Sequence, residues 1–199
     1  YGFNTEQPKK SHGVTHVYHF YTKRNLWTLA CLMNKSLSKK VKFLLTSIMI
    51  NTSKLYAYRT NGKGGDVAGT LYIPATNQEI NVLYAMKNKI TRIKNGFSKF
   101  QTSNSLISSQ SLSHVSNISG NQIDYIFTDP PFGGNLMYSE LSFIWESWLK
   151  VLTNNKSEAI MNDTQNKGLL EYKDLMTQCF KEYYRILKPN RWITVEFHN

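Results

Sequence analysis

The sequence predicts an α/β fold in which a mostly parallel sheet is flanked by helices. Two runs of β-prone residues, 123–128 and 191–197, are separated by two segments whose apolar residues recur at helical spacing. A strand, helices and a second strand over about 75 residues form a crossover unit, and such units join parallel strands. The chain has 199 residues, of which 41% are hydrophobic, and this is enough to bury a core.

Two helices are predicted in the first hundred residues. Thr22 is placed to cap a helix that runs to Leu37, because apolar residues recur there every three and four positions. Thr76 and Glu79 have the spacing of a capping box, which predicts a second helix that stops at Asn95. The side chains expected to face inward from this second helix are Ile80, Leu83, Ile90 and Ile93.

Two more helices are predicted between the strands. Ser139 is placed to cap the first, and Pro189 stops the second, which covers about 169–187. We interpret Trp145 and Trp148 as helix-packing residues rather than as a stacking platform for a ligand. The apolar faces include Leu141, Ile144, Trp145, Trp148 and Leu152 on the first helix, and Tyr172, Leu175, Cys179 and Tyr183 on the second.

The composition excludes several classes of protein. The longest apolar run, 41–50, is about half the length that a membrane span requires. Cys31 and Cys179 lie far apart and have no Cys or His neighbour at metal-ligand spacing, so neither a disulfide framework nor a zinc ribbon is expected. These observations predict a cytoplasmic protein that does not bind a membrane.

Composition also divides the chain into three parts. Residues 1–100 form a basic, helix-containing region, 101–122 form a polar connection rich in Ser and Asn, and 123–199 form the crossover unit. The chain begins with Tyr1, has no charged-then-apolar leader, and stops directly after a strand-like run. We therefore expect an internal piece of a longer protein, in which the fold is incomplete.

The net charge of +11 is concentrated in the first part of the chain. Residues 7–65 contain 11 Lys or Arg and no Asp or Glu. Residues 1–123 contain 16 basic and 3 acidic residues, whereas 124–199 contain 8 basic and 10 acidic residues. A long stretch without acids suits phosphate backbones, so the first part is predicted to contact nucleic acid.

The candidate site lies where the first predicted strand ends. In open parallel sheets, ligands bind outside the carboxyl ends of the strands. Asp129 follows the first strand, and the pair His198 and Asn199 follows the second. The segment after the first strand reads Asp129-Pro130-Pro131-Phe132-Gly133-Gly134.

This segment combines a carboxylate, a rigid backbone and an aromatic ring. A planar nucleobase can stack on Phe132, while its exocyclic amino group donates to the Asp129 carboxylate and to the Pro130 carbonyl. These hydrogen bonds draw the lone pair of the amino nitrogen out of ring conjugation, and Asp129 is positioned to take the departing proton. Gly133 and Gly134 are expected to let the chain pass close to the ligand.

The same segment resembles the (Asp/Asn/Ser)-Pro-Pro-(Tyr/Phe/Trp) motif of S-adenosylmethionine-dependent amino-methyltransferases. The stretch 123–148 looks like the site-specific DNA methylases that modify adenine N6 or cytosine N4, including its Tyr138-Ser139-Glu140-Leu141 and Trp145-Glu146-Ser147-Trp148 runs. Residues 186–192 resemble the helix end and next strand of that fold, with Asn190 where a glycine is usual. Residues 19–27 are similar to a segment of large bacterial methylases of this type.

The resemblance implies a Rossmann-like class I methyltransferase fold and methyl transfer from S-adenosylmethionine to the exocyclic amino group of a flipped DNA base. Adenine N6 is the expected target, because Asp at the first motif position is commoner in the adenine enzymes. A partner subunit of a restriction-modification system is also implied. The implied catalytic residues are Asp129, Pro130, Pro131 and Phe132, and the implied substrate-binding residues are Asn135 and Tyr138.

The resemblance does not extend to the cofactor site. The sequence lacks the F-x-G-x-G loop with which these enzymes hold S-adenosylmethionine, which fits either a truncated chain or a circularly permuted order. No residue is therefore assigned to the cofactor. No metal site is expected either, because the segment that contains His12, His16 and His19 has no carboxylate nearby.

Two other functions remain open. The first is an RNA amino-methyltransferase acting on guanine N2 or adenine N6, because Thr-Asp-Pro-Pro-aromatic-Gly also occurs in that group. The second is a nucleic-acid-binding module that has kept the fold and lost catalysis. An F-x-G-x-G loop elsewhere in the protein would favour an enzyme, and an RNA-binding domain would favour the first alternative.

Overall fold

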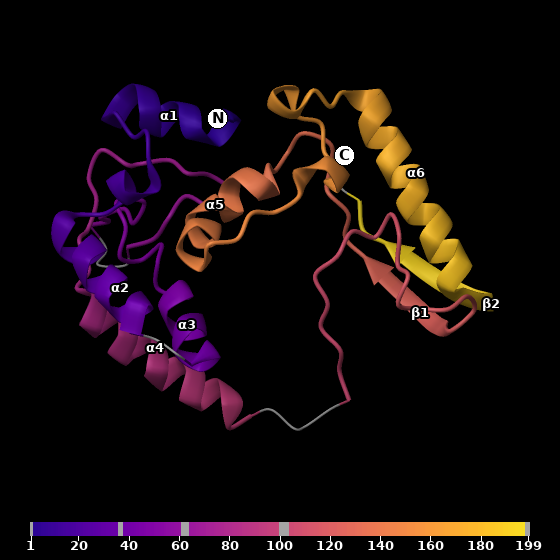
Figure 1. Cartoon of the computed structure of the whole chain (residues 1–199), viewed down its shortest axis with the longest axis horizontal. Helices are drawn as coiled ribbons and strands as arrows, with labels where there is room; N and C mark the ends of the chain where they lie inside the picture. Colours follow the sequence, from indigo (N-terminus) through magenta and orange to yellow (C-terminus); the bar gives the residue numbers. More distant parts are fainter. Residues whose placement is uncertain (1, 36–37, 61–63, 100–103, 198–199) are drawn as a thin grey trace. The chain divides into compact units, whose positions relative to one another are not determined.

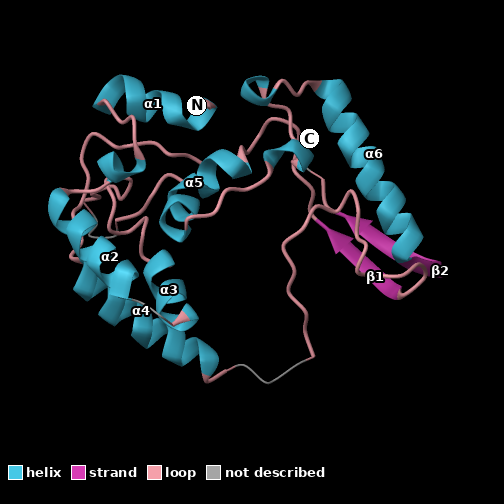
Figure 2. Ribbon diagram, in the orientation of Figure 1, coloured by secondary structure: helices cyan, strands magenta, loops and turns pink. Residues whose placement is uncertain are grey.

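The computed structural model describes residues 2–35, 38–60, 64–99 and 104–197 (Figure 1). These residues form six α-helices and a two-stranded parallel sheet, an arrangement compatible with the predicted α/β class (Figure 2). The elements are α1 (Phe3–His12), α2 (Lys23–Lys35), α3 (Lys39–Thr46), α4 (Val82–Phe97), β1 (Ile123–Thr128), α5 (Tyr138–Leu149), α6 (Leu169–Ile186) and β2 (Leu187–Val195).

Contacts within the chain divide it into two compact units. The first unit comprises Tyr1–Asn104 and Glu140–Leu152, and the second comprises Ser105–Ser139 and Thr153–Asn199. The first boundary lies close to the predicted one after residue 100. Residues 140–152, which we predicted to belong with 123–199, group with the first unit instead.

The core of the first unit is apolar and includes side chains of α5. Ile144 of α5 is fully buried in it, which is why this helix groups with the first unit. Trp145 Nε1 donates to the Thr46 carbonyl at 3.0 Å, and Trp148 Nε1 donates to the Tyr21 hydroxyl at 3.2 Å. Both tryptophans therefore pack within the unit, as predicted. The buried core also includes Phe20, Leu29, Leu45, Ile48, Leu55, Leu71, Ile73 and Val82.

The start of α2 is as predicted. Thr22 Oγ1 accepts a hydrogen bond from the Asn25 backbone N–H at 3.3 Å, so its side chain caps the helix. The buried Asn25 side chain donates to the carbonyl oxygens of Thr52 and Ile80, at 2.9 Å each, and thereby connects α2 to two loops. The predicted helix end, Leu37, lies outside the described residues.

The start of α4 differs from the prediction. The helix begins at Val82, because the Asn81 side chain accepts hydrogen bonds from the first backbone N–H groups of the helix. Asn is among the strongest N-cap residues, and this cap sets the helix register. Glu79, which we predicted in a capping box, instead accepts a hydrogen bond from the Thr22 hydroxyl at 2.7 Å. Leu83 and Ile90, which were predicted to face inward, are exposed.

The second unit contains the predicted crossover. β1 and β2 are parallel neighbours, so the predicted pairing is confirmed. Figures 1 and 2 both show α6 lying along the two strands. Thr128, the last residue of β1, pairs with Val195, the last residue of β2, so the carboxyl ends of both strands lie at one edge of the sheet.

The bounds of β2 differ from the prediction. The strand covers Leu187–Val195 rather than 191–197, and Pro189 lies within it instead of separating helix from strand. Extra residues of β2 interrupt its pairing with β1 at this point, as in a β-bulge, where proline is tolerated. Asn190 in this stretch has φ +59°, and after glycine, asparagine is one of the residues that best tolerate this conformation. Asn190 therefore fits a position where the resembling methylases usually have glycine.

The described part of the polar connection, 104–122, contains no helix or strand. Its last third is attached to the C-terminal end of α6. The Glu182 carboxylate accepts the Val115 N–H at 2.9 Å, Arg185 donates to the Val115 carbonyl at 2.8 Å, and the Gln122 N–H donates to the Ile186 carbonyl at 2.8 Å. The Arg185 guanidinium and the Val115 N–H lower the pKa of Glu182 to about 2. These bonds fix the backbone just before β1 begins.

Candidate functional site

The strand end that precedes Asp129 is held from two sides. Thr128 is buried, and its hydroxyl lies 3.0 Å from the Tyr183 hydroxyl on α6. The Thr128 carbonyl accepts the Glu196 N–H at 2.9 Å. Burial raises the pKa of Tyr183, which keeps its hydroxyl protonated at neutral pH. The turn that carries the motif therefore starts from a fixed backbone position.

Asp129 and Pro130 present two hydrogen-bond acceptors at the start of this turn. Asp129 is exposed, and no described residue donates a hydrogen bond to its carboxylate or forms an ion pair with it. The Pro130 carbonyl likewise accepts no hydrogen bond from the residues that the structure describes. An exocyclic amino group carries two N–H donors, so two acceptors at one turn match its hydrogen-bonding capacity.

The next residue, Pro131, attaches the turn to α6. Its carbonyl accepts a hydrogen bond from the Tyr172 hydroxyl at 2.7 Å. The Pro130 carbonyl, in contrast, accepts no hydrogen bond from a described residue, although Pro130 itself is buried. The rings of the two prolines restrict the backbone on either side of that oxygen.

Phe132 packs against a second aromatic ring from the end of β2. It is half-buried, and its ring centroid lies 5.3 Å from that of Phe197, with the ring planes at 81°. The Phe132 carbonyl accepts the Asn135 N–H at 3.1 Å and closes a turn. Gly133 in this turn has φ +56°, a conformation that favours glycine. The motif phenylalanine is therefore held by its backbone and by its ring.

The two glycines after Phe132 approach the protein's own chain rather than open space. A Cβ on Gly133 would lie 3.0 Å from Met161 Cε, and one on Gly134 would lie 3.4 Å from the Met161 carbonyl oxygen. The Met161 N–H donates to the Gly133 carbonyl at 3.1 Å. Both glycines therefore let the chain pass close to the segment around Met161. That they also let it pass close to a ligand stays a prediction.

The predicted substrate-binding residues lie on the stretch after the turn. Asn135 is exposed, and 46% of Tyr138 is exposed, so both side chains can reach a ligand. The structure shows no hydrogen bond between either side chain and Asp129. Ser139, predicted to cap α5, is instead its second residue, and its N–H and hydroxyl donate to the Glu158 carboxylate at 2.9 and 2.7 Å.

Several residues that hold the turn were not predicted. The sequence analysis placed Tyr172 and Tyr183 only on an apolar helix face, because helical spacing says nothing of what a hydroxyl contacts. Lys167 is buried and donates to the carbonyl oxygens of Asn155 and Glu158 at 2.6 and 2.7 Å, which closes the loop around Met161. Burial lowers the pKa of Lys167. No sequence pattern that we considered signals this loop.

The sequence offers no residue that can be assigned to S-adenosylmethionine, because it lacks the F-x-G-x-G loop. The segment around Met161 lies next to Gly133 and Gly134. We therefore assign no residue to the cofactor.

Two histidines of the first unit, His16 and His19, pack against each other and against Tyr18. His16 and His19 lie edge to face, with centroids 5.6 Å apart, and both contact Tyr18. In the part of the chain that the structure describes, no three His, Cys, Asp or Glu side chains are grouped closely enough to hold a metal ion. We therefore assign no residue to a metal.

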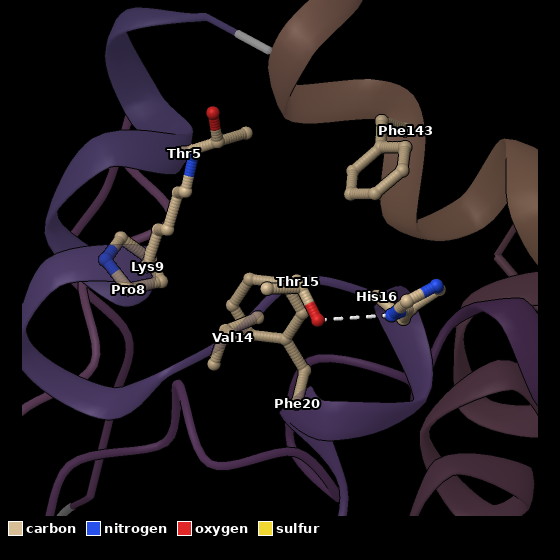
Figure 3. A pocket seen from close by; sticks show the side chains of 8 residues that line it. All are labelled: Thr5, Pro8, Lys9, Val14, Thr15, His16, Phe20 and Phe143. Atoms are coloured by element: carbon tan, nitrogen blue, oxygen red, sulfur yellow. Dashed lines mark hydrogen bonds between the residues drawn. The ribbon is translucent and has the colours of Figure 1, made fainter.

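A cavity of about 240 Å³ lies in the first unit (Figure 3). Its lining includes the buried side chains of Val14 and Phe20, and Phe143 of α5. At its rim the Thr15 hydroxyl and His16 Nδ1 are 2.9 Å apart. No residue that we predicted to bind the substrate or to catalyse lines this cavity.

The basic residues of the first unit are at its surface. Lys39, Lys40 and Lys42 on α3 are exposed, and among the described residues they form no ion pair. α4 contains four basic residues and no acid: Lys87, Lys89, Arg92 and Lys94.

No protein family, curated protein or solved structure that was compared with this chain matches it. The functional assignment therefore depends on the residues of the site. Across the described ranges, no helix has both the length and the apolar character that crossing a bilayer would need.

Proposed function

We propose that this chain is the catalytic part of an S-adenosylmethionine-dependent DNA amino-methyltransferase with a Rossmann-like fold. The observation that carries the proposal is the exposed Asp129 carboxylate, which has no partner among the described residues and is followed by the unbonded carbonyl of the buried Pro130, on a turn that Tyr172 holds to α6. This turn follows directly after a parallel strand, the position at which such sheets bind ligands.

The proposed chemistry uses these two acceptors on one amino nitrogen. Each N–H of an exocyclic amino group donates to one of them, which turns the nitrogen lone pair away from the aromatic ring and makes it nucleophilic. S-adenosylmethionine, when bound, would supply the methyl group by breaking its S–CH3 bond and would leave as a neutral thioether. The amino nitrogen that gains the methyl group becomes positively charged and must lose a proton. The exposed Asp129 carboxylate is the proposed acceptor of that proton.

The rest of the turn positions the base. Phe132 is the proposed stacking surface for an extruded base, while Asn135 and Tyr138 are the proposed contacts to its edge or sugar. Adenine N6 is the proposed target, with cytosine N4 as the other amino group of the same kind. The acid-free surface of the first unit supplies phosphate contacts, which position the nucleic acid without reading its sequence.

A methyl-transfer assay tests this function. The protein is incubated with labelled S-adenosylmethionine and mixed-sequence DNA, with RNA in a parallel reaction, and the product nucleosides are separated. We expect the label in DNA, on N6 of adenine. Label confined to RNA would contradict a DNA enzyme and favour the RNA amino-methyltransferase.

One observation favours a second candidate, a nucleic-acid-binding module without catalysis. The sequence lacks the F-x-G-x-G loop with which the resembling enzymes hold S-adenosylmethionine, and a module without catalysis needs no such loop. For this candidate, the same assay would show DNA binding with no label in either nucleic acid.

The proposed setting is a cytoplasmic restriction-modification system with a partner subunit. Cys31 and Cys179 are free thiols, which suits a reducing compartment. Co-purification of the tagged protein from its source cells would show whether a partner subunit is present.

A further inference from the structure

A groove of about 140 Å³ runs along one face of α4 in the first unit. Residues 84, 85, 88, 89 and 92 line it at intervals of three and four, so they form one stripe of the helix. The opposite wall comes from the segment after α3. The lining residues that bear on binding are Asn51, Tyr56, Tyr84, Asn88, Lys89 and Arg92.

The groove is positively charged. Lys89 and Arg92 lie three residues apart on the stripe, and among the described residues neither forms an ion pair. α4 contains no acidic residue, and the stretch 7–65, which supplies Ile48, Asn51 and Tyr56 to the other wall, contains none either. Two adjacent cations with no acid on either wall favour an anionic ligand.

The groove also carries an aromatic face and amide groups. Tyr84 is 62% exposed, so one face of its ring is accessible to a planar ligand. The side chains of Asn51 and Asn88 form no hydrogen bond with the residues that the structure describes. Aromatic rings and cations along one groove are the combination that binds single-stranded nucleic acid, in which bases stack and phosphates follow the positive charge. Amides add hydrogen bonds to sugar or base.

The length of the stripe agrees with this ligand. From Tyr84 to Arg92 the helix rises about 12 Å, at 1.5 Å per residue. Along a stacked strand each nucleotide rises about 3.4 Å, so the stripe matches the rise of roughly three nucleotides. Both cations can therefore contact phosphates of one strand while Tyr84 contacts a neighbouring base.

We propose that this groove is a binding site for a single nucleic-acid strand. Lys89 and Arg92 contact phosphates, Tyr84 stacks on a base, and Asn51 and Asn88 bond to sugar or base edges. The site deepens the proposed function, since it names where the first unit takes hold of the substrate. It can be measured without a methyl donor, so it stands or falls separately from methyl transfer.

Binding of a fluorescent single strand of about 16 nucleotides, followed by anisotropy at several salt concentrations, tests the cations. The double variant Lys89→Gln, Arg92→Gln is compared with Lys87→Gln, Lys94→Gln, which removes the same charge from the same helix outside the groove. We expect the groove pair to reduce the slope of log K against log salt by about 1.4, because each phosphate contact on a single strand contributes about 0.7. Equal slopes for the two pairs would overturn the proposal.

Substitutions of Tyr84 provide a second test that leaves the charge unchanged. Tyr84→Leu should weaken binding about 5- to 150-fold, whereas Tyr84→Phe, which keeps the ring, should bind like the wild type. Tyr58→Leu removes a similarly exposed tyrosine outside the groove and should have little effect. Wild-type affinity in Tyr84→Leu would overturn the proposal, even if the double lysine and arginine variant failed to fold.

A third variant separates this proposal from the proposed function. Asp129→Ala should keep the salt slope that depends on Lys89 and Arg92, because Asp129 does not line the groove. If the wild type binds the strand through the groove but transfers no methyl group, the proposed function is wrong and the groove proposal stands. If it transfers methyl groups at a rate that substitutions of Lys89, Arg92 and Tyr84 do not change, the groove proposal is wrong and the proposed function stands.

Discussion

The Asp129 carboxylate and the Pro130 carbonyl are the chemically distinctive groups of this protein. Both are hydrogen-bond acceptors that no described residue occupies, while the neighbouring acceptor on Pro131 is bonded to Tyr172. Two acceptors without a partner, next to one that is bonded within the protein, suit a ligand with two donors on one atom.

Substitutions of Phe132 show whether its ring stacks on a base or only packs inside the protein. Phe132→Tyr and Phe132→Trp keep a flat ring and should retain methyl transfer. Phe132→Leu should lower the rate of methyl transfer about 5- to 150-fold. Because Phe132 also packs against Phe197, melting temperatures must be measured beside the rates. A stable, active Leu variant together with an unstable Trp variant would mean that Phe132 only fills space.

The strand end that precedes Asp129 could be predicted from the sequence, because its signals are local. A β-prone run followed by two prolines defines where β1 ends and where Asp129 lies, and β1 ends there in the structure. The contacts that hold the turn come from Tyr172, Phe197 and Met161, which are 26 or more residues away in the chain. Local patterns carry no information about such pairings.

For single helices, the prediction of the first residue depended on which nearby side chain caps the N-terminus. Thr22 has no stronger competitor nearby, and it caps α2 as expected. For α4, Asn81 outcompetes the capping box at Thr76 and Glu79, since Asn is the stronger cap and stands next to the helix. The inward face of α4 contains the buried Val82 and the partly buried Ala85 and Met86, so Leu83, which periodicity had assigned to the core, is exposed.

The cap of α4 gives a stability prediction. Asn81→Ala should lower the free energy of unfolding by about 1 kcal/mol, because two backbone N–H groups lose their acceptor. Thr76→Ala is the matched control, and its effect should stay within about 0.5 kcal/mol, since the Thr76 side chain is exposed. Urea unfolding measures both. A larger loss in Thr76→Ala than in Asn81→Ala would restore the capping box.

The attachment of the polar connection to α6 gives a pH prediction. Because the pKa of Glu182 is about 2 in the folded protein and its reference value is 4.5, the unfolded chain binds the proton more tightly. The stabilisation from this carboxylate is therefore complete above about pH 4.5 and is lost as the pH falls towards 2.

Glu182→Gln removes this titration. The stability of the wild type should fall more steeply than that of the variant between about pH 4.5 and 2, as measured by chemical unfolding at each pH. Parallel curves for the two proteins would show that Glu182 does not hold residues 115–122 to α6.

At the scale of the whole molecule, charge and chemistry are divided between the two units. The first unit carries the acid-free stretch 7–65 and the α4 groove, and the second carries the Asp129 turn. The sequence showed the charge division directly, because net charge needs no folding information. It did not show that 140–152 groups with the first unit, since that depends on the burial of Ile144 and on Trp145 and Trp148 packing against distant residues.

The central claim is that the Asp129 carboxylate acts on the amino group of a base. Asp129→Ala should lower the rate of methyl transfer from labelled S-adenosylmethionine by about a hundredfold or more and leave DNA affinity unchanged, because phosphate contacts supply most of the binding. Asp174→Ala is the matched control, since it removes an exposed carboxylate of the same unit from α6. We expect an active Asp174 variant and an inactive Asp129 variant that still binds DNA. An Asp129→Ala protein that retained more than about a tenth of the wild-type rate would contradict it.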